Sequence, residues 1–456
     1  MRWFEKILVV AAVLVVSSCD WTAFDDLAQR APVQAAEPPG GLDVFGRSVI
    51  PMDGYDASHG GRSNLLVLAG SGTEAVVRLS MDGDGAFSLK SGGEPDPSLD
   101  KEPGSVTALA QIRSDDADAS AVLVAMASKG LVYSVTIPKK GGPVPVIGGL
   151  INWTDGSWEM FGQALAVTDM DGDGKDDWAV VSSQSIYVFP DADDGVSNSR
   201  VLHCDASHQC ATDCGAYLGD RPVAAIGNLL GDLSRPTLAV GLPDDTGGRV
   251  VLMSWSGSGS LPTGDCRDAT DLVRVTVEAP NDAGSFGMAL AVYDVDGDGR
   301  DELFVGAPDQ SRVYVYQGTS DATGWQMALV ATIAPSAGDA VAFGSAIALV
   351  DLDGDGAPEL AVGDSQAPEG GKVGAGRVHL FRLTSQGGIA AEELGVVADM
   401  HPQTRGHFGK GLGAIVAQSV QHWVPGTAGV AQELVIVSDK QVYAFLKTGI
   451  DGDVRP

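Results

Sequence analysis

Basic residues are scarce in this chain of 456 residues. It has 29 lysines and arginines against 60 aspartates and glutamates, which gives a formal net charge of −31. Nucleic-acid binding needs a basic face to neutralise phosphates, so we expect no nucleic-acid partner. The 60 glycines follow no Gly-X-Y period, which excludes collagen, and a hydrophobic content of 44% excludes wholesale disorder.

Long apolar runs are also missing. No stretch after the N-terminus reaches 18 apolar residues, so the sequence predicts no membrane-spanning helix there. The apolar run from Ile7 to Val16 is too short to span a bilayer and is typical of a secretory signal core. It ends in Val16-Ser17-Ser18-Cys19, which resembles the bacterial lipobox.

The lipobox resemblance implies that residues 1–18 are a signal peptide and that Cys19 is lipidated. We therefore expect a cell-envelope protein, anchored to the inner or outer membrane through its N-terminal lipid and facing the periplasm or the exterior. An ordinary signal peptide with a stray cysteine is the alternative. Residues 19–41 hold three prolines and a Gly-Gly pair without a strand pattern, which predicts a flexible tether spanning roughly 25 Å.

Cysteine is rare, with five residues in all. Those other than Cys19 are Cys204, Cys210, Cys214 and Cys266. Four cysteines in an exported chain predict two disulfides, and the sequence does not choose among the three possible pairings. A zinc site that also uses nearby histidines is the alternative, but CxxC pairs are absent and export favours oxidation.

The chain repeats itself. A Phe-Gly pair opens an apolar segment at Phe161, Phe286 and Phe343, and an acidic loop and a second apolar run follow each segment. Weaker copies bring the repeat starts to positions near 45, 105, 161, 220, 286, 343 and 408. A period of about 60 residues accommodates four short strands with their loops.

The repeats predict an all-β fold. Their apolar runs alternate weakly, which indicates strands that are covered on both faces. Four-stranded sheets stacked around an axis satisfy this requirement, so residues 42–456 are predicted to form a seven-bladed β-propeller. A solenoid would need polar capping repeats at its ends, which the sequence does not show. The ring would close with a strand from the other terminus, for which only Leu27 to Ala36 is available.

Three nine-residue acidic loops, in the third, fifth and sixth repeats, contain the candidate metal ligands. Each has carboxylates at positions 1, 3, 5 and 9 and glycines at positions 4 and 6. Four negative charges converge only around a cation, and hard oxygen ligands in a flexible loop select Ca²⁺. The predicted side-chain ligands are Asp169, Asp171, Asp173 and Asp177; Asp294, Asp296, Asp298 and Glu302; and Asp351, Asp353, Asp355 and Glu359. The main-chain carbonyls of Lys175, Arg300 and Ala357 would complete the three shells.

Two other interpretations of these loops exist. An EF-hand needs a bidentate Glu at position 12 and flanking helices, whereas position 12 is Val180, Val305 or Val362 inside an apolar run. A metal-free Asp-Gly turn explains one loop better than it explains three with the same spacing. The fourth and seventh repeats lack the set and are predicted to be free of metal.

The motifs resemble the FG-GAP repeat, known from the seven-bladed propeller of integrin α subunits. Phe286-Gly287 matches its Phe-Gly, Gly306-Ala307-Pro308 matches its Gly-Ala-Pro, and the acidic loop between them matches its Ca²⁺ loop. The Gly-Ala-Pro is altered elsewhere, for example in Gly363-Asp364. The resemblance implies Ca²⁺ loops on a lower face and ligand contacts on the opposite, upper face, in the loops ahead of each Phe-Gly.

The sequence therefore predicts a calcium-stabilised, lipid-anchored binding or adhesion module that recognises a protein or a glycan. Candidate ligand-binding residues ahead of two Phe-Gly segments are Trp153, Trp158, His401, Arg405 and His407. The alternative is a Ca²⁺-dependent hydrolase or lyase acting on polysaccharide. No Ser/His/Asp or Cys/His arrangement stands out, so we expect no enzyme.

Overall fold

A computed structural model of the chain describes most of its repeats. The described residues are 33–36, 45–52, 64–69, 76–81, 87–90, 107–112, 119–127, 130–138, 146–152, 160–183, 185–190, 202–205, 222–230, 235–244, 247–257, 261, 264–265, 271–280, 284–322, 324–336, 338–352, 355–399, 401–416, 432–439 and 441–445.

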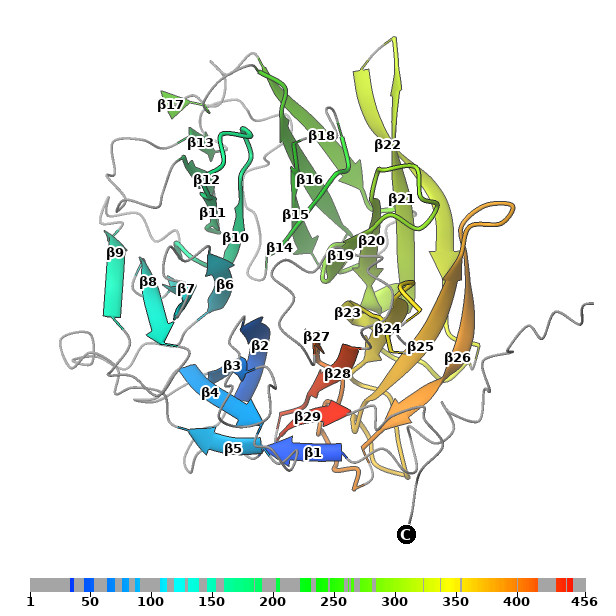
Figure 1. Ribbon diagram of the computed structural model, residues 1–456. Coiled ribbons are helices and arrows are strands. Elements are labelled where there is room, and N and C mark those ends of the chain that lie inside the picture. The colour runs from blue at the N-terminus through cyan, green and yellow to red at the C-terminus, as the bar shows by residue number, and fades with distance from the viewer. Residues whose placement is uncertain are drawn as a thin grey trace, which may run out of the picture.

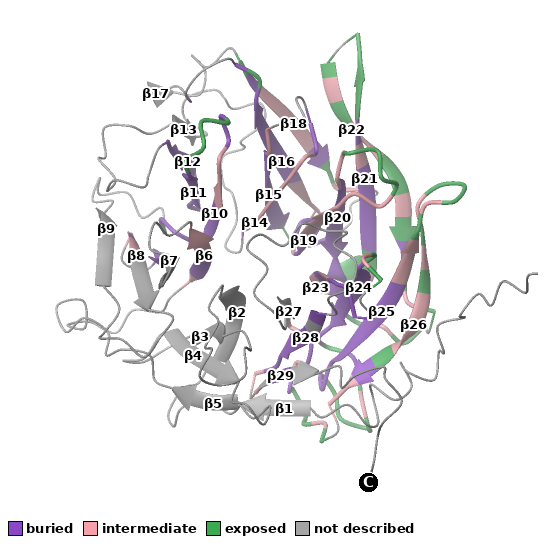
Figure 2. Ribbon diagram, viewed as in Figure 1, coloured by how far each residue is buried: buried purple, intermediate pink, exposed green. Residues whose placement is uncertain are grey.

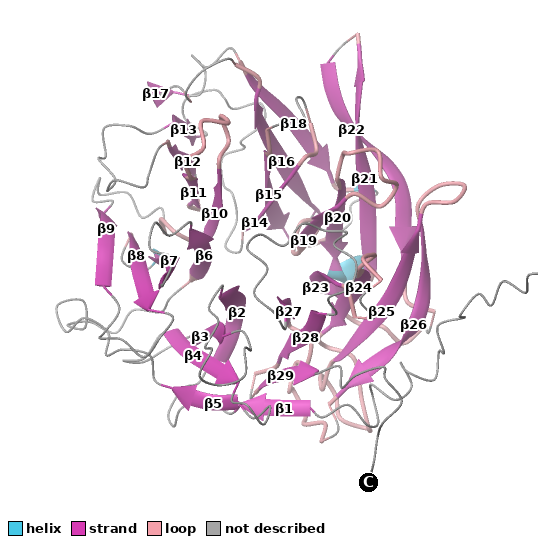
Figure 3. Ribbon diagram, viewed as in Figure 1, coloured by secondary structure: helices cyan, strands magenta, loops and turns pink. Residues whose placement is uncertain are grey.

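The strands of the described residues (Figure 3) form seven sheets, which are numbered 1 to 7 in chain order. Sheet 1 holds β2 (Phe45–Met52), β3 (Asn64–Ala69), β4 (Val76–Met81) and β5 (Phe87–Lys90). Sheet 2 holds β6 (Ala108–Ile112), β7 (Ala119–Met126), β8 (Leu131–Pro138) and β9 (Val146–Asn152). Sheet 3 holds β10 (Ala164–Thr168), β11 (Asp177–Val181), β12 (Ser185–Phe189) and β13 (Leu202–Asp205), with β17 (Gly264–Asp265) parallel to β13.

The other sheets follow the same plan. Sheet 4 holds β14 (Val223–Gly227), β15 (Thr237–Asp244), β16 (Gly247–Trp255) and β18 (Leu272–Glu278). Sheet 5 holds β19 (Leu290–Tyr293), β20 (Glu302–Ala307), β21 (Arg312–Asp321) and β22 (Gly324–Ile333), with the short 3-10 helix η6 (Pro308–Gln310). Sheet 6 holds β23 (Phe343–Val350), β24 (Glu359–Asp364), β25 (Arg377–Thr384) and β26 (Ala390–Ala398). Sheet 7 holds β27 (Gly411–Val416), β28 (Gln432–Val437), β29 (Val442–Phe445) and β1 (Val33–Ala36).

The first strands of the sheets surround a common centre (Figure 1). β2, β6, β10, β14, β19, β23 and β27 contact one another in chain order, and β27 also contacts β2. Strand β1 joins sheet 7 as the antiparallel neighbour of β29, with Val33 opposite Phe445. These four residues lie within the segment expected to be a tether, so the strand pairing corrects that expectation for Val33–Ala36.

The core lies between neighbouring sheets. One hydrophobic cluster joins sheets 3 and 4, and others join sheets 2 and 3, 4 and 5, 5 and 6, and 6 and 7. Strands β11, β20 and β24 are buried along their whole length, whereas the outer strands β22 and β26 carry exposed residues (Figure 2). Burial on both faces explains why these inner runs show little polar alternation, as the sequence predicted.

The phenylalanines of the Phe-Gly segments are buried in this core. Phe161, Phe286, Phe343 and Phe408 are all at most 2% exposed. Each ring packs against an aromatic residue on the third strand of its own sheet, for example Phe161 on Tyr187 with centroids 5.2 Å apart and Phe408 on Tyr443 at 5.0 Å. In sheets 3, 5, 6 and 7 this Phe therefore anchors the start of the sheet to its third strand.

Glycines allow neighbouring sheets to approach closely. A Cβ added to Gly241, Gly306 or Gly363 on a second strand would overlap the carbonyl oxygen of the Phe-Gly glycine of the next sheet. The partners are Gly287, Gly344 and Gly409, which all have a positive φ between 82° and 97°. The glycine of the Gly-Ala-Pro motif and the glycine of the next Phe-Gly are thus in contact with each other across neighbouring sheets.

We predict that Gly306→Ala destabilises the protein by about 1–3 kcal/mol, the usual penalty for overpacking, because the backbone of the next sheet must move. Chemical denaturation measures the change. Gly395→Ala on β26 is the matched control, since nothing lies within 4 Å of its added Cβ. Equal stability of the two variants would contradict the role given to this contact.

Candidate metal centres

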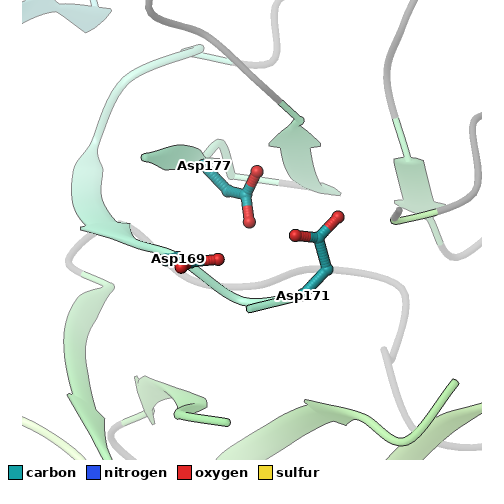
Figure 4. Close-up of side chains that lie close together, drawn as sticks. All are labelled: Asp169, Asp171 and Asp177. Atoms are coloured by element: carbon teal, nitrogen blue, oxygen red, sulfur yellow. The ribbon is translucent and has the colours of Figure 1, made fainter. Parts of the chain in front are cut away.

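Two groups of three carboxylates meet in the loops that join a first strand to a second strand. Asp169, Asp171 and Asp177 form one group between β10 and β11 (Figure 4). Asp294, Asp296 and Glu302 form the other between β19 and β20. In each group one oxygen atom from every residue lies within 4.8 Å of the others. The sequence placed all six residues in metal sites, and the fold brings them together.

The carboxylate at position 1 folds each loop around itself. Asp169 Oδ1 accepts hydrogen bonds from the N–H groups of Gly172 (2.7 Å) and Asp173 (3.0 Å). Its Oδ2 accepts one from Gly174 at 2.8 Å. In the second loop Asp294 accepts the same three bonds, from Gly297, Asp298 and Gly299. The spacing of acids and glycines therefore encodes one conformation twice.

The carboxylate at position 9 closes each loop from the start of the second strand. Asp177 accepts a hydrogen bond from Met170 N at 2.7 Å, and Glu302 accepts one from Val295 N at 2.8 Å. Both side chains are buried, with exposed fractions of 1% and 0%. One carboxylate oxygen of each residue therefore ties the start of the second strand to the loop.

The third loop, between β23 and β24, repeats these bonds where it is described. Glu359 accepts from Leu352 N at 2.9 Å, and Asp351 accepts from Gly356 N at 3.0 Å. Asp355 accepts from Ala357 N at 2.8 Å, as Asp298 does from Arg300 N in the second loop. Asp353 lies outside the described residues, so the four-carboxylate site in this loop stays a prediction.

Glu302 shows the electrostatic strain of such a loop. Burial raises the pKa of its carboxyl to about 7, and the charges of Asp296, Asp294 and Asp298 act in the same direction against the hydrogen bond from Val295. Its Oε1 is buried and has no hydrogen-bond partner. A buried carboxylate oxygen that faces further carboxylates is a ligand position for a hard cation. Asp294, Asp296 and Glu302 therefore fit a divalent ion.

Each acidic loop is also bound to a neighbouring sheet. Asp171 accepts a hydrogen bond from Leu261 N at 2.7 Å. Asp301 accepts one from Asn228 N at 2.6 Å, and Asp351 N donates to Gln432 Oε1 at 2.9 Å. Sequence reasoning missed Asp301 and Gln432. The only available signal was the extra acid at position 8, because contacts between repeats leave no spacing pattern.

The structure describes three of the five residues proposed for ligand binding. His401, Arg405 and His407 all lie on the connection between β26 and β27, at the end opposite the acidic loops. His407 Nδ1 is 2.5 Å from Asp439 Oδ2. The other oxygen of Asp439, Oδ1, accepts a hydrogen bond from Lys410 Nζ at 2.6 Å. Burial alone would raise the pKa of Asp439, but these two hydrogen bonds outweigh it and hold the pKa below its usual range.

Arg405 is exposed, and both it and His407 have positive φ values of 55° and 48°. Their backbone N–H groups donate to Val373 O and Gly374 O in the connection between β24 and β25. Several other candidates fall outside the described residues or their described side chains: Trp153, Trp158, Cys19, Cys204, Cys210, Cys214 and Cys266. Lipidation, the disulfides and the tryptophans stay predictions.

The chain is similar to known proteins over part of its length. An FG-GAP-like repeat model matches residues 294–362, from the second acidic loop into β24. Integrin alpha-PS2 of Drosophila melanogaster is 30% identical over 201 residues, which cover 40% of this chain and 13% of that protein. Integrin alpha-IIb of Homo sapiens is 33% identical over 177 residues, which cover 36% of this chain and 15% of that protein. The match thus spans a small part of either integrin chain.

Two solved structures are similar at low scores. A protein of Bacteroides uniformis assigned as a 6-phosphogluconolactonase has a TM-score of 0.45 and 11% identity, over 87% of this chain and 98% of that one. The exotype rhamnogalacturonan lyase YesX has a TM-score of 0.31 and 13% identity, over 84% and 80%. Neither likeness bears on the activity of this chain.

The repeated Phe-Gly segments, the acidic loops and the integrin matches agree with one another. Residues 294–362 match the FG-GAP-like repeat, and the chain is similar over part of its length to integrin α subunits.

Proposed function

We propose that the seven sheets are the blades of one closed β-propeller that serves as a calcium-stabilised binding or adhesion module outside the cytoplasm. The observation that carries the proposal is the shared conformation of the acidic loops in sheets 3, 5 and 6. The contact of β27 with β2 and the pairing of β1 with β29 support ring closure. The integrin relatives support an adhesion role.

Calcium suits the loops better than other ions. The donors brought together are carboxylate oxygens, which hard cations prefer, and Ca²⁺ accepts irregular coordination geometry. One Ca²⁺ would offset half of the four negative charges in each loop. With a Kd of about 0.1 mM and about 1 mM Ca²⁺, mass action gives roughly 1.4 kcal/mol per site. We propose three such sites.

We predict that removing calcium lowers the melting temperature by about 5 °C, because three sites together contribute about 4 kcal/mol. Mg²⁺ should restore the loss poorly, since it demands a tighter octahedral shell. Calorimetry on protein stripped of metal should give three Ca²⁺ per chain. A melting curve that does not respond to chelator would return the loops to ordinary Asp-Gly turns.

Glu302→Gln should change stability in opposite directions with and without calcium. The raised pKa of Glu302 means that its ionised form destabilises the metal-free fold progressively from about pH 4.5 to about pH 7 and fully above that. At about pH 8 the neutral Gln should therefore stabilise the metal-free protein by about 1–2 kcal/mol. In calcium the same variant should be less stable than the parent, because it loses an anionic ligand.

Denaturation in chelator and in calcium measures this reversal. Exposed Glu392 on β26 provides the matched control, and Glu392→Gln should leave both values unchanged within about 0.5 kcal/mol. If Glu302→Gln destabilises the protein equally in both conditions, Glu302 is a structural hydrogen-bond acceptor and not a calcium ligand.

The binding surface is proposed to be the end of the sheets opposite the acidic loops. Connections ahead of Phe-Gly lie there, including the exposed His401 and Arg405. We propose a protein or glycan ligand, and binding rather than catalysis, because the proposed metal sites would use the repeated carboxylates as ligands. The combined variant His401→Ala/Arg405→Ala should weaken capture of envelope proteins or glycans on immobilised protein while leaving the melting temperature unchanged. Capture equal to that of the parent would exclude these two residues.

Membrane anchoring is proposed to run through a lipid on Cys19. Among the described residues no helix is long and apolar enough to cross a membrane. We predict that Cys19→Ala releases the protein into the soluble fraction, because one thiol carries the lipid. Fractionation after expression in a bacterial host measures the change, with Ser18→Ala as the conservative control. Membrane association that persists in Cys19→Ala would exclude lipidation at this residue.

A further inference from the structure

Sheet 4 lies between two sheets with candidate metal loops, and its sequence has no such loop (Figure 1). Its connection between β14 and β15 stands in the same place. Asn228 follows the end of β14 as Asp169 follows β10 and Asp294 follows β19. At the start of β15, Thr237 Oγ1 accepts a hydrogen bond from Leu230 N at 3.0 Å. A hydroxyl thus closes this connection where a buried carboxylate closes the acidic loops.

The acidic loop of sheet 5 holds the start of this connection. Asn228 N donates to Asp301 Oδ2 at 2.6 Å, and Asp301 N donates to Asn228 O at 3.1 Å. A Cβ added to Gly227 would lie 2.7 Å from the same Asp301 oxygen. Asp301 stands between Arg300, whose carbonyl is a predicted ligand, and Glu302. The position of Asn228 is therefore tied to the candidate site of sheet 5.

Sheet 5 also packs against the next two residues of the connection. Leu229 and Leu230 are fully buried in the hydrophobic cluster that joins sheets 4 and 5. A Cβ added to Gly318 on β21 would lie 2.1 Å from Leu229 O and 3.7 Å from the Leu230 side chain. Residues 228–230 of sheet 4 therefore contact sheet 5 at every position.

The acidic loop of sheet 3 contacts another part of sheet 4. Asp171 Oδ2 accepts a hydrogen bond from Leu261 N at 2.7 Å, while its Oδ1 accepts one from Asp173 N inside the loop at 3.2 Å. Leu261 is 4% exposed and lies in the cluster that joins sheets 3 and 4. A Cβ added to Gly172 would lie 3.8 Å from Arg235 Nε. A predicted ligand of the sheet 3 site is thus bonded directly to sheet 4.

The two contact regions are joined inside sheet 4. Ser254 Oγ on β16 donates to Leu230 O at 3.5 Å. Trp255 ends β16, and a Cβ added to Gly257 would lie 2.4 Å from its ring. Gly257 O in turn accepts a hydrogen bond from Arg235 Nη1. Described residues in contact with one another therefore run through sheet 4 from one acidic loop to the other.

A sheet held by two loops gives those loops a common cost of ordering. An ion that orders one loop also orders the part of sheet 4 bonded to it. The second loop then closes against a partner that is already ordered, so less conformational entropy is lost when its own ion binds. Coupling of this kind is reciprocal, because each site must raise the affinity of the other by the same factor.

We propose that sheet 4 couples the candidate calcium sites of sheets 3 and 5, with Asp301 as the positioning residue, so that these two sites bind calcium cooperatively. The coupling rests on the proposed function, because it requires both loops to bind calcium. The loop of sheet 6 bonds instead to sheet 7, where Asp351 N donates to Gln432 Oε1 at 2.9 Å and Gln432 N donates to Asp351 O at 2.6 Å. The sites of sheets 3 and 6 should therefore be independent.

Calorimetric titration of the intact chain with Ca²⁺ measures the coupling. Position 5 of the loops offers three matched substitutions, Asp173→Asn, Asp298→Asn and Asp355→Asn. Each of these aspartates is exposed, and its Oδ1 accepts a hydrogen bond from the N–H at position 7, an acceptor that Asn keeps. One substitution leaves two sites, and two substitutions leave a single site whose intrinsic affinity can be measured.

Asp355→Asn leaves the sites of sheets 3 and 5. The product of their two association constants should be about fivefold larger than the product of the two single-site constants, at the lower end of the usual range for coupled sites. Asp298→Asn leaves the sites of sheets 3 and 6, for which this ratio should be about one. A ratio of about one for both pairs would overturn the coupling but leave calcium binding intact. If no variant and no parent protein binds Ca²⁺, the proposed function fails and the coupling fails with it.

Asp301→Ala tests the positioning residue. Added to Asp355→Asn, it should reduce the fivefold ratio to about one, with the single-site constants measured in the same background and both sites still binding. Asp309→Ala is the matched control, because it removes a carboxylate from the connection between β20 and β21, at the other end of sheet 5. It should leave the ratio unchanged. A fivefold ratio that survives in Asp301→Ala would overturn the role of Asp301.

Hydrogen exchange decides the matter if Asp301→Ala does not fold. Residues 228–230 include no predicted ligand, yet in the parent protein their protection should be about fivefold higher in excess calcium than in chelator. The rise should be smaller in Asp298→Asn, which lacks the site beside Asp301. Equal protection of residues 228–230 in calcium and in chelator, in protein that binds Ca²⁺, would overturn the proposal.

Discussion

One close contact between backbones sets how sheet 4 meets sheet 5, sheet 5 meets sheet 6 and sheet 6 meets sheet 7. A glycine at the end of a second strand lies against the carbonyl of the Phe-Gly glycine of the next sheet, at Gly241, Gly306 and Gly363. Glycine is favoured at both positions, because a Cβ at the first would overlap the neighbouring carbonyl and the second has a positive φ. The adjacent phenylalanine then fills the core between the strands. The two short motifs are therefore conserved within the chain as one packing unit.

This packing puts the acidic loops at one end of the sheets and the crossovers at the other end. Antiparallel strands place the connection between first and second strands at one end and the crossover into the next Phe-Gly at the other. The first end carries the acidic loops, which donate or accept hydrogen bonds across to a neighbouring sheet through Asp171, Asp301 and Asp351. A cation in such a loop would therefore steady two sheets and not one.

Sheet 4 illustrates the dependence on neighbours. It has no acidic loop of its own, yet the connection that follows its first strand begins at Asn228, which bonds to Asp301 of the loop in sheet 5. Sheet 6 uses charge differently at its other end, where Asp364, Arg377 and Glu393 hold a crossover. Asp364 occupies the position of the alanine in Gly-Ala-Pro. The departure from the repeat at Asp364 thus gives sheet 6 a carboxylate contact to the crossover that precedes it.

The sequence by itself determined the all-β class of fold and the acidic loops, because both depend on residues close together in the chain. Phe-Gly, the apolar runs and the spacing of Asp and Gly in residues 169–177 and 294–302 act within one repeat, and the structure shows the six predicted carboxylates together. Only the tertiary structure decided the role of Val33–Ala36, whose strand signal is weak and whose partner β29 lies at the other end of the chain. The same is true of Asn228 with Asp301 and of His379 between Asp364 and Glu393. These partners meet across strands or sheets, and distances of that kind leave no periodicity in a sequence.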